Sequence, residues 1–415
     1  MRLARELPPT AGLPLRPADL LPRRADLARA VSGFLGCAPP LIASSGTAAL
    51  LVALATLREG FARRRVVFPA YTCPLVPLAI LAAGLDPVAC DVLPHSPDLD
   101  PDALGRLLDR DTLAVLPTHL GGRLADVDAA RRAAKLVGAF VVEDAAQAFG
   151  ASRDGMPTGL LGDIGFHSLA IGKGLTLYEG GLLHARDPVL RAALARHGHR
   201  MLRPDHAMEA LRVLQLTAAA LLYRPAGLAL AYGAPLRRAL RKGDLIGAVG
   251  DRFEPDVPVH AVGIWRRGVG TAAIRRFPEH LRRTREVAVR LRERLDGVGG
   301  FRALGDRPGE RGTWPVLMLL APTRTVRDLA LARLWTRGLG VGRMFIHAIS
   351  DHPDLLGRVG DAAVPNARDL ADRLLTVGTS EWVSEADAAA IRAGLEGAAS
   401  EHPPDEEGAP RELVA

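Results

Sequence analysis

One lysine in the sequence has the surroundings of a residue that does covalent chemistry. Lys173 lies between Gly172 and Gly174 in an otherwise uncharged segment, and it is one of only three lysines among 53 Lys and Arg residues. Arginine therefore supplies almost all of the positive charge, so a lysine at this position indicates a task that a guanidinium cannot perform. An amine can lose its proton and attack a carbonyl to form a Schiff base. The alternative is an ordinary solvated surface charge.

An aspartate at the end of an apolar run supplies a partner for such chemistry. Asp144 closes the segment Phe140–Asp144, which has the composition of a buried strand. A carboxylate placed there can keep the ring nitrogen of pyridoxal phosphate protonated, as this cofactor requires when it acts as an electron sink. Gln147 could reach the ring hydroxyl from the next turn. Alternatively, Asp144 only caps a short helix over 145–149.

A hydroxyl-rich turn supplies groups that would bind the cofactor's phosphate. Ser45, Gly46 and Thr47 follow the apolar run Leu41–Ala43 and open a helical pattern. Free backbone N–H groups at a helix start, together with hydroxyl groups, bind phosphate. Ser168, shortly before Lys173, adds a second hydroxyl. The alternative for Ser45 and Thr47 is a purely structural role as helix caps.

Five segments in register resemble the DegT/StrS family of nucleotide-sugar aminotransferases. They are Ser-Gly-Thr-Ala-Ala from Ser45, Pro-Ala-Tyr-Thr from Pro69, Glu-Asp-Ala-Ala-Gln from Glu143, the segment from Ser168 to Lys173, and Glu-Gly-Gly from Glu179. The resemblance covers residues 30–185 and, more loosely, 266–397. It implies an α/β protein of pyridoxal-phosphate fold type I, with a mostly parallel central sheet in a large domain and a smaller C-terminal α/β domain.

The resemblance also implies a reaction. An amino group would pass from L-glutamate to a nucleotide-linked keto-deoxysugar, in polysaccharide or secondary-metabolite biosynthesis, within a cytoplasmic homodimer whose subunits share their sites. Lys173 would hold pyridoxal phosphate and move a proton on the donor, while Asp144 pairs with the ring nitrogen. Tyr71, His119 and His347 would lie near the substrate, although each histidine could equally be a packed or loop residue.

Two departures from the family pattern keep alternatives open. Cys73 stands where the family usually has an aromatic residue that stacks on the cofactor ring. The segment Pro258–Gly263 lacks the asparagine that reaches the neighbouring subunit's phosphate, and His260 is the candidate replacement. One alternative is a sugar dehydratase, although relatives of that kind typically carry histidine at the lysine position. The other is a non-catalytic regulator built on the same fold.

Short apolar runs alternate with helical patterns from residue 41 onward. The predicted strands are Leu41–Ala43, Val66–Phe68, Pro87–Asp91, Leu113–Leu116, Phe140–Glu143, Ile164–Ser168 and Leu182–Ala185. The predicted helices cover 24–35, 48–58, 74–83, 101–108 and 125–137. This alternation indicates a mostly parallel sheet with helices on both faces, and sites in such sheets form beyond the carboxyl ends of strands. Asp144 and the Ser45 turn fall at such ends.

The second half of the chain predicts a smaller α/β unit. Its predicted helices are Thr271–Asp296, Val326–Arg337, Ala367–Leu375 and Ser384–Ala398, and its predicted strands are Trp314–Leu320 and Val341–Phe345. Ser384 and Asp387 have the spacing of a capping box. We therefore expect a large domain over 1–255, a small domain over 256–399, and a disordered tail over 400–415.

Composition narrows the classes of function. Hydrophobic residues make up 48% of the chain and charged residues 24%, as in ordinary soluble globular proteins. The net charge of +7 does not predict nucleic-acid binding, because the arginines are mixed with acidic residues and no zinc-finger spacing occurs. Cys37, Cys73 and Cys90 lack metal-ligand spacing and indicate reduced thiols in the cytoplasm, so no metal is expected. The N-terminus shows no apolar signal-peptide core.

The segment 201–255 departs from the family. Its two uncharged runs, 213–223 and 226–236, flank Arg224 and Pro225, and the basic residues Arg237, Arg238, Arg241 and Lys242 follow. Each run is too short to span a membrane, which takes about 20 residues. We favour a helical hairpin that packs on the core or on a partner subunit. The alternative is an interfacial element over 207–242, with apolar side chains among lipid headgroups and the basic cluster on anionic lipid.

Overall fold

A seven-stranded sheet forms the centre of the protein, with strand order β1-β9-β8-β5-β4-β2-β3. The computed structural model describes residues 5–21, 26–250, 257–360 and 363–402. The strands of this sheet are β1 (Leu41–Ala43), β2 (Arg65–Pro69), β3 (Asp86–Cys90), β4 (Thr112–Val115), β5 (Phe140–Asp144), β8 (Ile164–Ser168) and β9 (Gly181–Ala185). All seven strands predicted for this half of the chain are therefore confirmed, with ends that differ by at most one residue.

The strand directions place the predicted site residues at one edge of the sheet. The strands β8, β5, β4, β2 and β3 are parallel to one another, whereas β9 is antiparallel to both β8 and β1. The prediction of a mostly parallel sheet is confirmed. Asp144 of β5 pairs in register with Phe166 of β8. Because adjacent parallel strands end at the same edge, Asp144 and Ser168 leave the sheet side by side.

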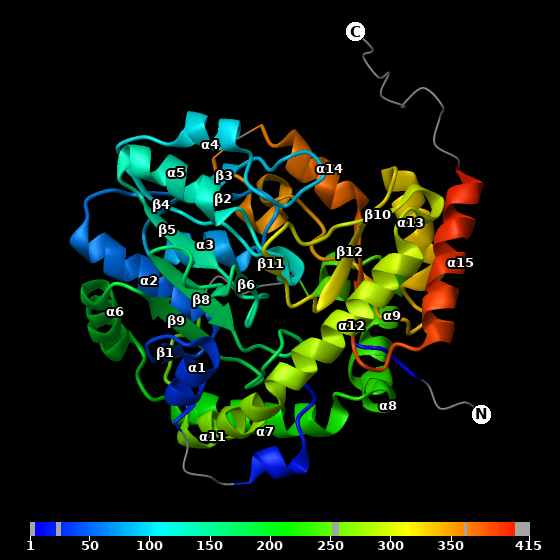
Figure 1. Cartoon of the computed structure of the whole chain (residues 1–415), viewed down its shortest axis with the longest axis horizontal. Helices are drawn as coiled ribbons and strands as arrows, with labels where there is room; N and C mark the ends of the chain where they lie inside the picture. The colour runs from blue at the N-terminus through cyan, green and yellow to red at the C-terminus, as the bar shows by residue number, and fades with distance from the viewer. Residues whose placement is uncertain (1–4, 22–25, 251–256, 361–362, 403–415) are drawn as a thin grey trace.

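Helices cover both faces of this sheet (Figure 1). Along β2, Val66 and Phe68 join the apolar core formed with α2 and α3, whereas Val67 joins the core formed with α4 and α5. This alternation is the period of two that a strand buried on both faces shows. The helices of this half are α1 (Leu27–Leu35), α2 (Gly46–Gly60), α3 (Leu75–Ala82), α4 (Pro101–Leu107), α5 (Val127–Val137) and α6 (Pro188–Met201). The predicted start of α1 falls on residues 24 and 25, outside the described residues.

A second sheet, antiparallel throughout, occupies the C-terminal half with the order β10-β12-β14-β13. Its strands are β10 (Arg302–Ala303), β12 (Val316–Leu320), β13 (Val341–Gly342) and β14 (Leu374–Gly378). The helices of this half are α11 (Ile264–Ala273), α12 (Phe277–Leu295), α13 (Arg324–Leu334), α14 (Pro365–Arg373) and α15 (Glu385–Glu401). Three further two-residue strands pair with one another: β6 (Ser152–Arg153), β7 (Met156–Pro157) and β11 (Glu310–Arg311). Short 3-10 turns are η1 (Pro17–Leu20), η2 (Leu120–Gly122), η4 (Ile274–Arg276), η5 (Val298–Gly300), η6 (Ile349–Asp351) and η7 (Pro353–Leu355).

The structure corrects several predicted elements of the C-terminal half. The predicted helix Thr271–Asp296 is divided by the turn η4, because Pro278 lies in the first turn of α12 and lacks the N–H that would continue a helix. The predicted helix Ala367–Leu375 ends at Arg373, and β14, which the sequence reasoning missed, follows at once. The predicted strand Val341–Phe345 keeps only its first two residues. The capping box of Ser384 and Asp387 is confirmed.

The two sheets share contacts that cross the predicted domain boundary. Leu7 and Leu236, from the predicted large domain, belong to the apolar core of the C-terminal sheet. The carboxylate of Asp91, just after β3, accepts hydrogen bonds from the N–H groups of Asn366 (3.2 Å) and Ala367 (2.9 Å) at the start of α14. The domain boundaries stay a prediction. Of the predicted disordered tail, Ser400 and Glu401 belong to α15, and 403–415 lies outside the described residues.

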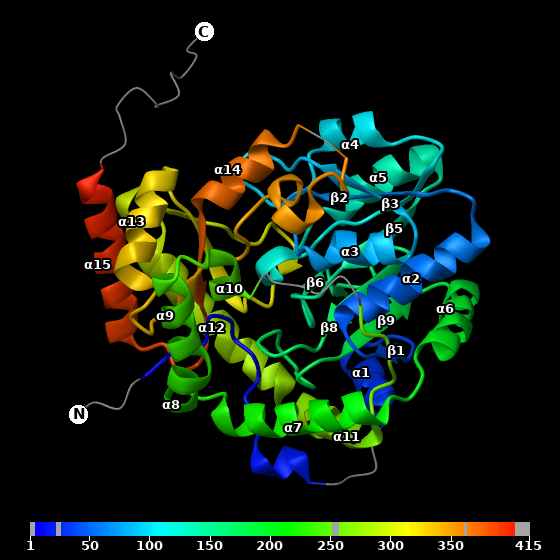
Figure 2. The ribbon, with the colours of Figure 1, turned by 180° about the vertical axis from the view of Figure 1, so that it is seen from behind.

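The segment that departs from the family forms two helical arms at the rim of the molecule (Figure 2). The first arm is α7 (His206–Leu222). The second contains α8 (Pro225–Leu228), the π-helix η3 (Ala229–Gly233) and α9 (Ala234–Arg241), after which α10 (Leu245–Val249) follows. Within the described residues, no single helix is long and apolar enough to cross a membrane. Among the described helices, the bent pair of arms meets that criterion only when both arms are taken together, and the criterion considers length and composition alone.

Candidate active site

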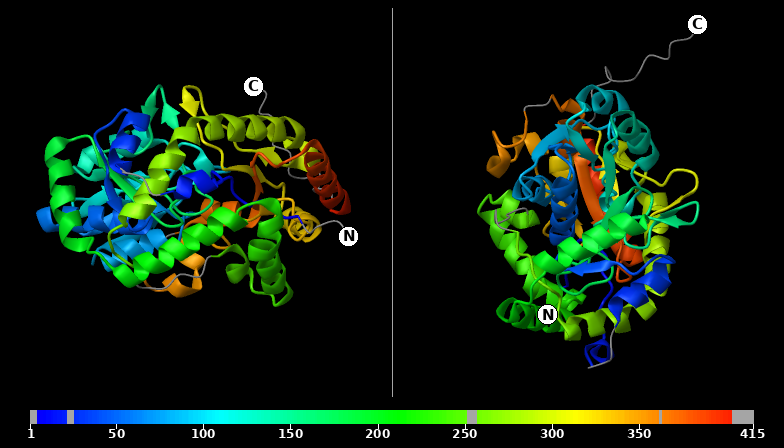
Figure 3. Two further views of the ribbon diagram at one scale, coloured as in Figure 1. Left: turned by 90° about the horizontal axis from the view of Figure 1, so that it is seen from below. Right: turned by 90° about the vertical axis from the view of Figure 1, so that its left-hand side faces the viewer.

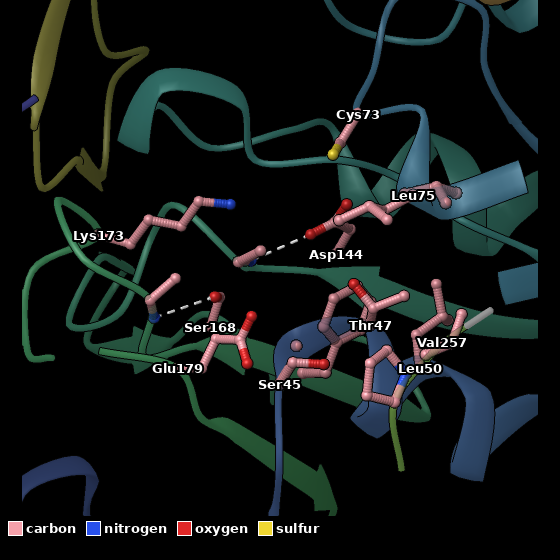
Figure 4. Close-up of a pocket in the computed structure, with 16 residues that line it drawn as sticks. Ser45, Thr47, Leu50, Cys73, Leu75, Asp144, Ser168, Lys173, Glu179 and Val257 are labelled. Atoms are coloured by element: carbon pink, nitrogen blue, oxygen red, sulfur yellow. Dashed lines mark hydrogen bonds between the residues drawn. The ribbon is translucent and has the colours of Figure 1, made fainter. Parts of the chain in front are cut away.

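A cavity of about 300 Å³ lies at the carboxyl edge of the large sheet, where β5, β8 and the start of α2 meet. Seven residues singled out in the sequence line it: Ser45, Gly46, Thr47, Cys73, Asp144, Ser168 and Lys173. Figure 4 shows the labelled side chains around this cavity. The tertiary structure thus brings together groups that come from four separate segments of the chain.

Lys173 extends into the cavity from the loop between β8 and β9 (Figure 4). Both flanking glycines have positive φ, +79° at Gly172 and +81° at Gly174, a region that other residues rarely adopt. A Cβ at Gly172 would also overlap the hydroxyl of Thr10. The loop therefore needs both glycines in order to present the lysine. Among the described residues, the Lys173 amine has no hydrogen-bond partner.

Asp144 faces Lys173 from the end of β5 (Figure 4), with only 4% of its surface exposed. Its Oδ1 accepts a hydrogen bond from the Ala146 N–H at 3.0 Å, and Oδ2 has no partner within the described part of the chain. Burial raises the pKa of this carboxyl, whereas the Ala146 N–H and the nearby Lys173 and His119 act to lower it. Residues 145–149 form turns, so the predicted alternative of a helix cap is wrong. A buried carboxylate with an unused oxygen is best stabilised by a cationic partner.

The N-terminus of α2 borders the same cavity. Ser45 is its N-cap and accepts a hydrogen bond from the Ala48 N–H at 3.0 Å, so the capping role is confirmed. The N–H groups of Gly46 and Thr47 have no partner among the described residues, as expected for the first turn of a helix. A Cβ at Gly46 would lie 3.0 Å from the Ser168 Cβ, so the glycine lets α2 approach that hydroxyl. Free N–H groups, hydroxyls and the positive end of a helix dipole together form an anion site.

The sequence reasoning missed one charged residue and the apolar wall of the site. Glu179 lines the cavity, and its carboxylate pairs with Arg212 of α7 at 2.7 Å. This glutamate belongs to the Glu-Gly-Gly segment, so its proximity to Lys173 along the chain was a usable signal. The wall contains Leu50, Leu75 and Phe166. Ordinary apolar residues such as these carry no sequence signal that separates a site wall from a core.

A segment near residue 258 of the same chain closes one side of the cavity. Val257 and Pro258 line it, and the Ser44 hydroxyl donates a hydrogen bond to the Pro258 carbonyl at 2.9 Å. The His260 N–H donates to that hydroxyl at 3.3 Å. The His260 ring is buried, its Nε2 has no partner in the described structure, and the residue is absent from the cavity lining. Its role in binding phosphate stays a prediction.

Two other predicted site residues are engaged outside the cavity lining. The Gln147 side-chain oxygen accepts a hydrogen bond from the Gly121 N–H at 2.7 Å, and its amide nitrogen lies 3.7 Å from the Met344 sulfur. The Tyr71 hydroxyl accepts from the Phe345 N–H at 3.3 Å, and the two rings meet edge to face. Both side chains thereby connect the large sheet to the segment after β13.

The two predicted histidines also lie apart from the cavity lining. The His119 ring is fully buried; its Nδ1 accepts from the Ala125 N–H at 2.9 Å, so its Nε2 carries the proton and donates to Glu143 at 3.0 Å. His347 packs edge-on against His352, and burial, followed by His352 and Arg343, lowers its pKa. The roles of Tyr71, His119, Gln147 and His347 toward a ligand stay predictions.

The groups in the cavity fit pyridoxal phosphate. Its aldehyde carbon needs a free amine, its ring nitrogen needs a carboxylate, and its phosphate needs N–H and hydroxyl donors. The cavity presents the unpaired amine of Lys173, the unused Oδ2 of Asp144, and the α2 N-terminus with Ser45, Thr47 and Ser168. Each requirement is therefore met by a group that the rest of the described structure leaves available.

Comparisons with known proteins find aminotransferases among similar sequences and similar structures. Residues 20–218 match the model of the DegT/DnrJ/EryC1/StrS aminotransferase family. The chain is 37% identical over 174 residues to an L-glutamine:2-deoxy-scyllo-inosose aminotransferase of Streptomyces fradiae. The matched region covers 42% of this chain and 40% of that protein. It is 31% identical over 166 residues to the GDP-perosamine synthase of Caulobacter vibrioides. This second matched region covers 40% of this chain and 44% of that protein. The matches thus span about two fifths of these curated relatives.

The structural likeness extends further along the chain. The aminotransferase TlmJ of Streptoalloteichus hindustanus is similar over 92% of each chain, with a TM-score of 0.67 and 25% identity. The expected fold, that of type I pyridoxal-phosphate aminotransferases, is confirmed. Residues 20–218, just under half of the chain, therefore have the sequence pattern of the DegT/DnrJ/EryC1/StrS aminotransferases, a family whose members depend on pyridoxal phosphate.

Proposed function

We propose that this protein is a pyridoxal-phosphate-dependent aminotransferase that transfers an amino group to the keto carbon of a nucleotide-linked deoxysugar. One observation carries the proposal. The Lys173 amine and Asp144 Oδ2, neither of which has a partner among the described residues, face each other across a cavity that the α2 N-terminus also borders. Buried polar groups are normally paired, so two opposed groups left available indicate a ligand that joins them.

The residues of the chain have distinct tasks in this reaction. When bound, pyridoxal phosphate supplies an electron sink for the negative charge that develops at the donor's Cα. Lys173 would hold the cofactor and, as a free amine, would move a proton between the donor's Cα and C4′ of the cofactor. Asp144 would keep a proton on the ring nitrogen, and Ser45, Thr47 and Ser168 would orient the phosphate. Leu50, Leu75 and Phe166 line the same cavity and would give the bound reactants an apolar wall.

The proposed substrates follow the relatives and the resemblance. The name of the Caulobacter vibrioides relative contains a nucleotide-linked aminosugar, which supports a nucleotide-linked acceptor. We propose L-glutamate as the donor, and L-glutamine, which the name of the Streptomyces fradiae relative contains, is the competing donor in the test. We further propose a homodimer that acts in the cytoplasm, in polysaccharide or secondary-metabolite biosynthesis.

The first test is the absorbance spectrum of the purified protein. We expect a visible band from bound cofactor that L-glutamate bleaches more efficiently than L-glutamine, followed by amination of one member of a keto-sugar panel. Lys173→Ala should remove the band and lower turnover by at least about 10³-fold, because both the attachment point and the base are lost. Lys135→Ala, an exposed lysine on α5, should leave both unchanged.

Other outcomes would separate the alternatives. Wild-type turnover by Lys173→Ala would contradict the assignment of that lysine. A sugar product that has lost a hydroxyl group without gaining nitrogen would identify a dehydratase. Protein that is folded but never binds the cofactor would favour the non-catalytic regulator.

A further inference from the structure

The first arm of the divergent segment exposes a row of leucines. Leu211, Leu214 and Leu221 of α7 recur at helical spacing and share one face, opposite the buried Leu216 and Ala220. Leu214 and Leu221 are each 68% exposed. A surface helix normally turns its apolar side chains toward the core and its polar ones toward water. Here α7 does bury one apolar side, and a second apolar side remains open.

The second arm also exposes an apolar side chain and lines a hollow together with α7. It turns away from α7 at an angle of 114°, and in the view from below the green α8–α9 segment projects from the body of the molecule (Figure 3). Leu230 of η3 is 72% exposed. An apolar hollow of about 460 Å³ lies between the arms, lined by Ala218 and Leu222 on one side and Leu228 and Ala231 on the other. We call the exposed leucines of α7 (Leu211, Leu214 and Leu221), with this hollow, the apolar face.

From residue 210 to the end of the second arm, every charged side chain is basic. Residues 210–243 contain no Asp or Glu and six basic residues. Arg212 and Arg237 are neutralised by ion pairs with Glu179 and Glu6. The other four are exposed and have no acidic partner within the described part of the chain: Arg224, Arg238, Arg241 and Lys242. Exposed leucines beside exposed cations are the composition of a helix that lies at an anionic membrane surface.

We propose that the apolar face binds the surface of an anionic lipid bilayer. The leucines enter the boundary between headgroups and acyl chains, and the four exposed cations contact the anionic headgroups. The arms lie on the membrane, since no single described helix is long enough to cross it. The hollow is also lined by Gly172 and Tyr178 of the loop that carries Lys173. A bound membrane would therefore lie beside the candidate active site.

A second copy of this chain fits the apolar face less well. A twofold contact brings the same surface patch of both subunits together. The four exposed cations would then stand near their own counterparts, with no acidic residue in 210–243 to neutralise them. The sequence favoured a hairpin packed on the core or on a partner subunit. Packing on the core accounts for the buried Leu216, Leu228 and Leu236, but it leaves the exposed leucines without a role.

The test is flotation of the full-length, cofactor-bound protein with vesicles. One set contains phosphatidylcholine alone and the other contains phosphatidylcholine mixed with phosphatidylglycerol. We expect the protein to float only with the anionic vesicles. The combined change Arg238→Gln, Arg241→Gln and Lys242→Gln should weaken partitioning about 100-fold at low salt, because each cation near an anionic surface contributes about fivefold. The combined change Leu211→Gln, Leu214→Gln and Leu221→Gln should abolish flotation without altering charge.

Matched controls come from the exposed face of α5. Arg131→Gln, Arg132→Gln and Lys135→Gln remove the same three charges elsewhere, and Leu136→Gln replaces a leucine that is 87% exposed. These variants should float like the wild type, and circular dichroism should show that all variants are folded. The proposal is overturned if the wild type stays with the soluble fraction. It is also overturned if the α5 variants lose vesicle binding to the same extent, which would show that binding depends only on the net charge of the protein. It is also overturned if the leucine variants change the mass measured by light scattering while no vesicle binding is found, which would identify a contact between copies.

Discussion

At the residue scale, the candidate site depends on a carboxylate that is buried before any ligand arrives. Burial raises the pKa of Asp144, and only one of its oxygens is used by the described structure. Ionising such a group in the empty cavity costs free energy, which a cationic ring nitrogen would offset. Asp144 therefore lowers the stability of the cofactor-free fold and raises the stability of the cofactor-bound fold.

A neutral replacement separates these two effects. Asp144→Asn keeps the size of the side chain and removes its charge, so it cannot hold a proton on the ring nitrogen. We expect kcat to fall by about 10²–10³-fold, the range for a lost electrostatic contact in an active site, with cofactor still detectable by absorbance. The cofactor-free variant should melt at a higher temperature than the cofactor-free wild type, because no charge is buried. Normal turnover, or a lower melting temperature, would contradict this role.

At the element scale, one buried arginine connects two helices to the loop of the site. The Arg266 side chain, from α11, is fully buried. Its Nε donates to both carboxylate oxygens of Glu209 on α7, at 3.0 and 3.1 Å, and its Nη1 donates to the Glu179 carbonyl at 2.7 Å. Glu179 lines the cavity, so the position of this wall depends on how α7 and α11 pack.

Removing this arginine should therefore affect both stability and the site. Arg266→Met keeps an unbranched apolar stem and leaves Glu209 without its partner, which should lower the free energy of unfolding by about 3–5 kcal/mol. Urea unfolding measures the change, and weaker retention of the cofactor should accompany it. Arg282→Met on α12 is the matched control, since its pairs with Glu279 and Glu286 are exposed to solvent and contribute little. An equal effect of both changes would contradict the connecting role.

At the scale of the whole molecule, stability should depend on buried neutral histidines. His184 of β9 and His167 of β8 are both buried, and His184 Nε2 lies 3.1 Å from His167 Nδ1. The Thr158 hydroxyl donates a hydrogen bond to the Ala148 carbonyl at 2.7 Å. Its oxygen therefore accepts a hydrogen bond from the Nε2–H group of His167 at 3.3 Å. Burial lowers the pKa of His184 to about 4. The pair stays neutral at physiological pH and joins two neighbouring strands.

Acid should therefore destabilise the fold before the carboxylates titrate. An unfolded histidine has a pKa of about 6.5, so between pH 6.5 and pH 4 the unfolded chain binds more protons than the folded one. Stability falls as pH is lowered through that window, by about 2 kcal/mol between pH 7.5 and pH 5 for His184 alone. His184→Asn should flatten the dependence of unfolding free energy on pH. His199→Asn, an exposed histidine on α6, should leave the dependence unchanged.

Much of the candidate site could be predicted because its signals are local. Asp144 and Ser168 stand at the ends of strands whose apolar runs are continuous in the sequence, and parallel strands end at a common edge. Lys173 was recognisable from its glycine neighbours, which the structure shows in conformations that need glycine. The contacts of Gln147 with Met344 and of Tyr71 with Phe345 could not be predicted from the sequence. Their partners, Met344 and Phe345, lie about 200 or more residues away along the chain.

The sequence by itself determined which reactive groups this protein has and the strands and helices that carry them, because periods of 2 and 3.6 residues and helix caps are properties of neighbouring residues. Only the tertiary structure decided which of several identical residues is buried and which is exposed to solvent. Leu214 and Leu216 are the same residue on the same helix, yet the first is exposed and the second is buried. Burial depends on which distant segments pack against each face, and no local pattern contains that information.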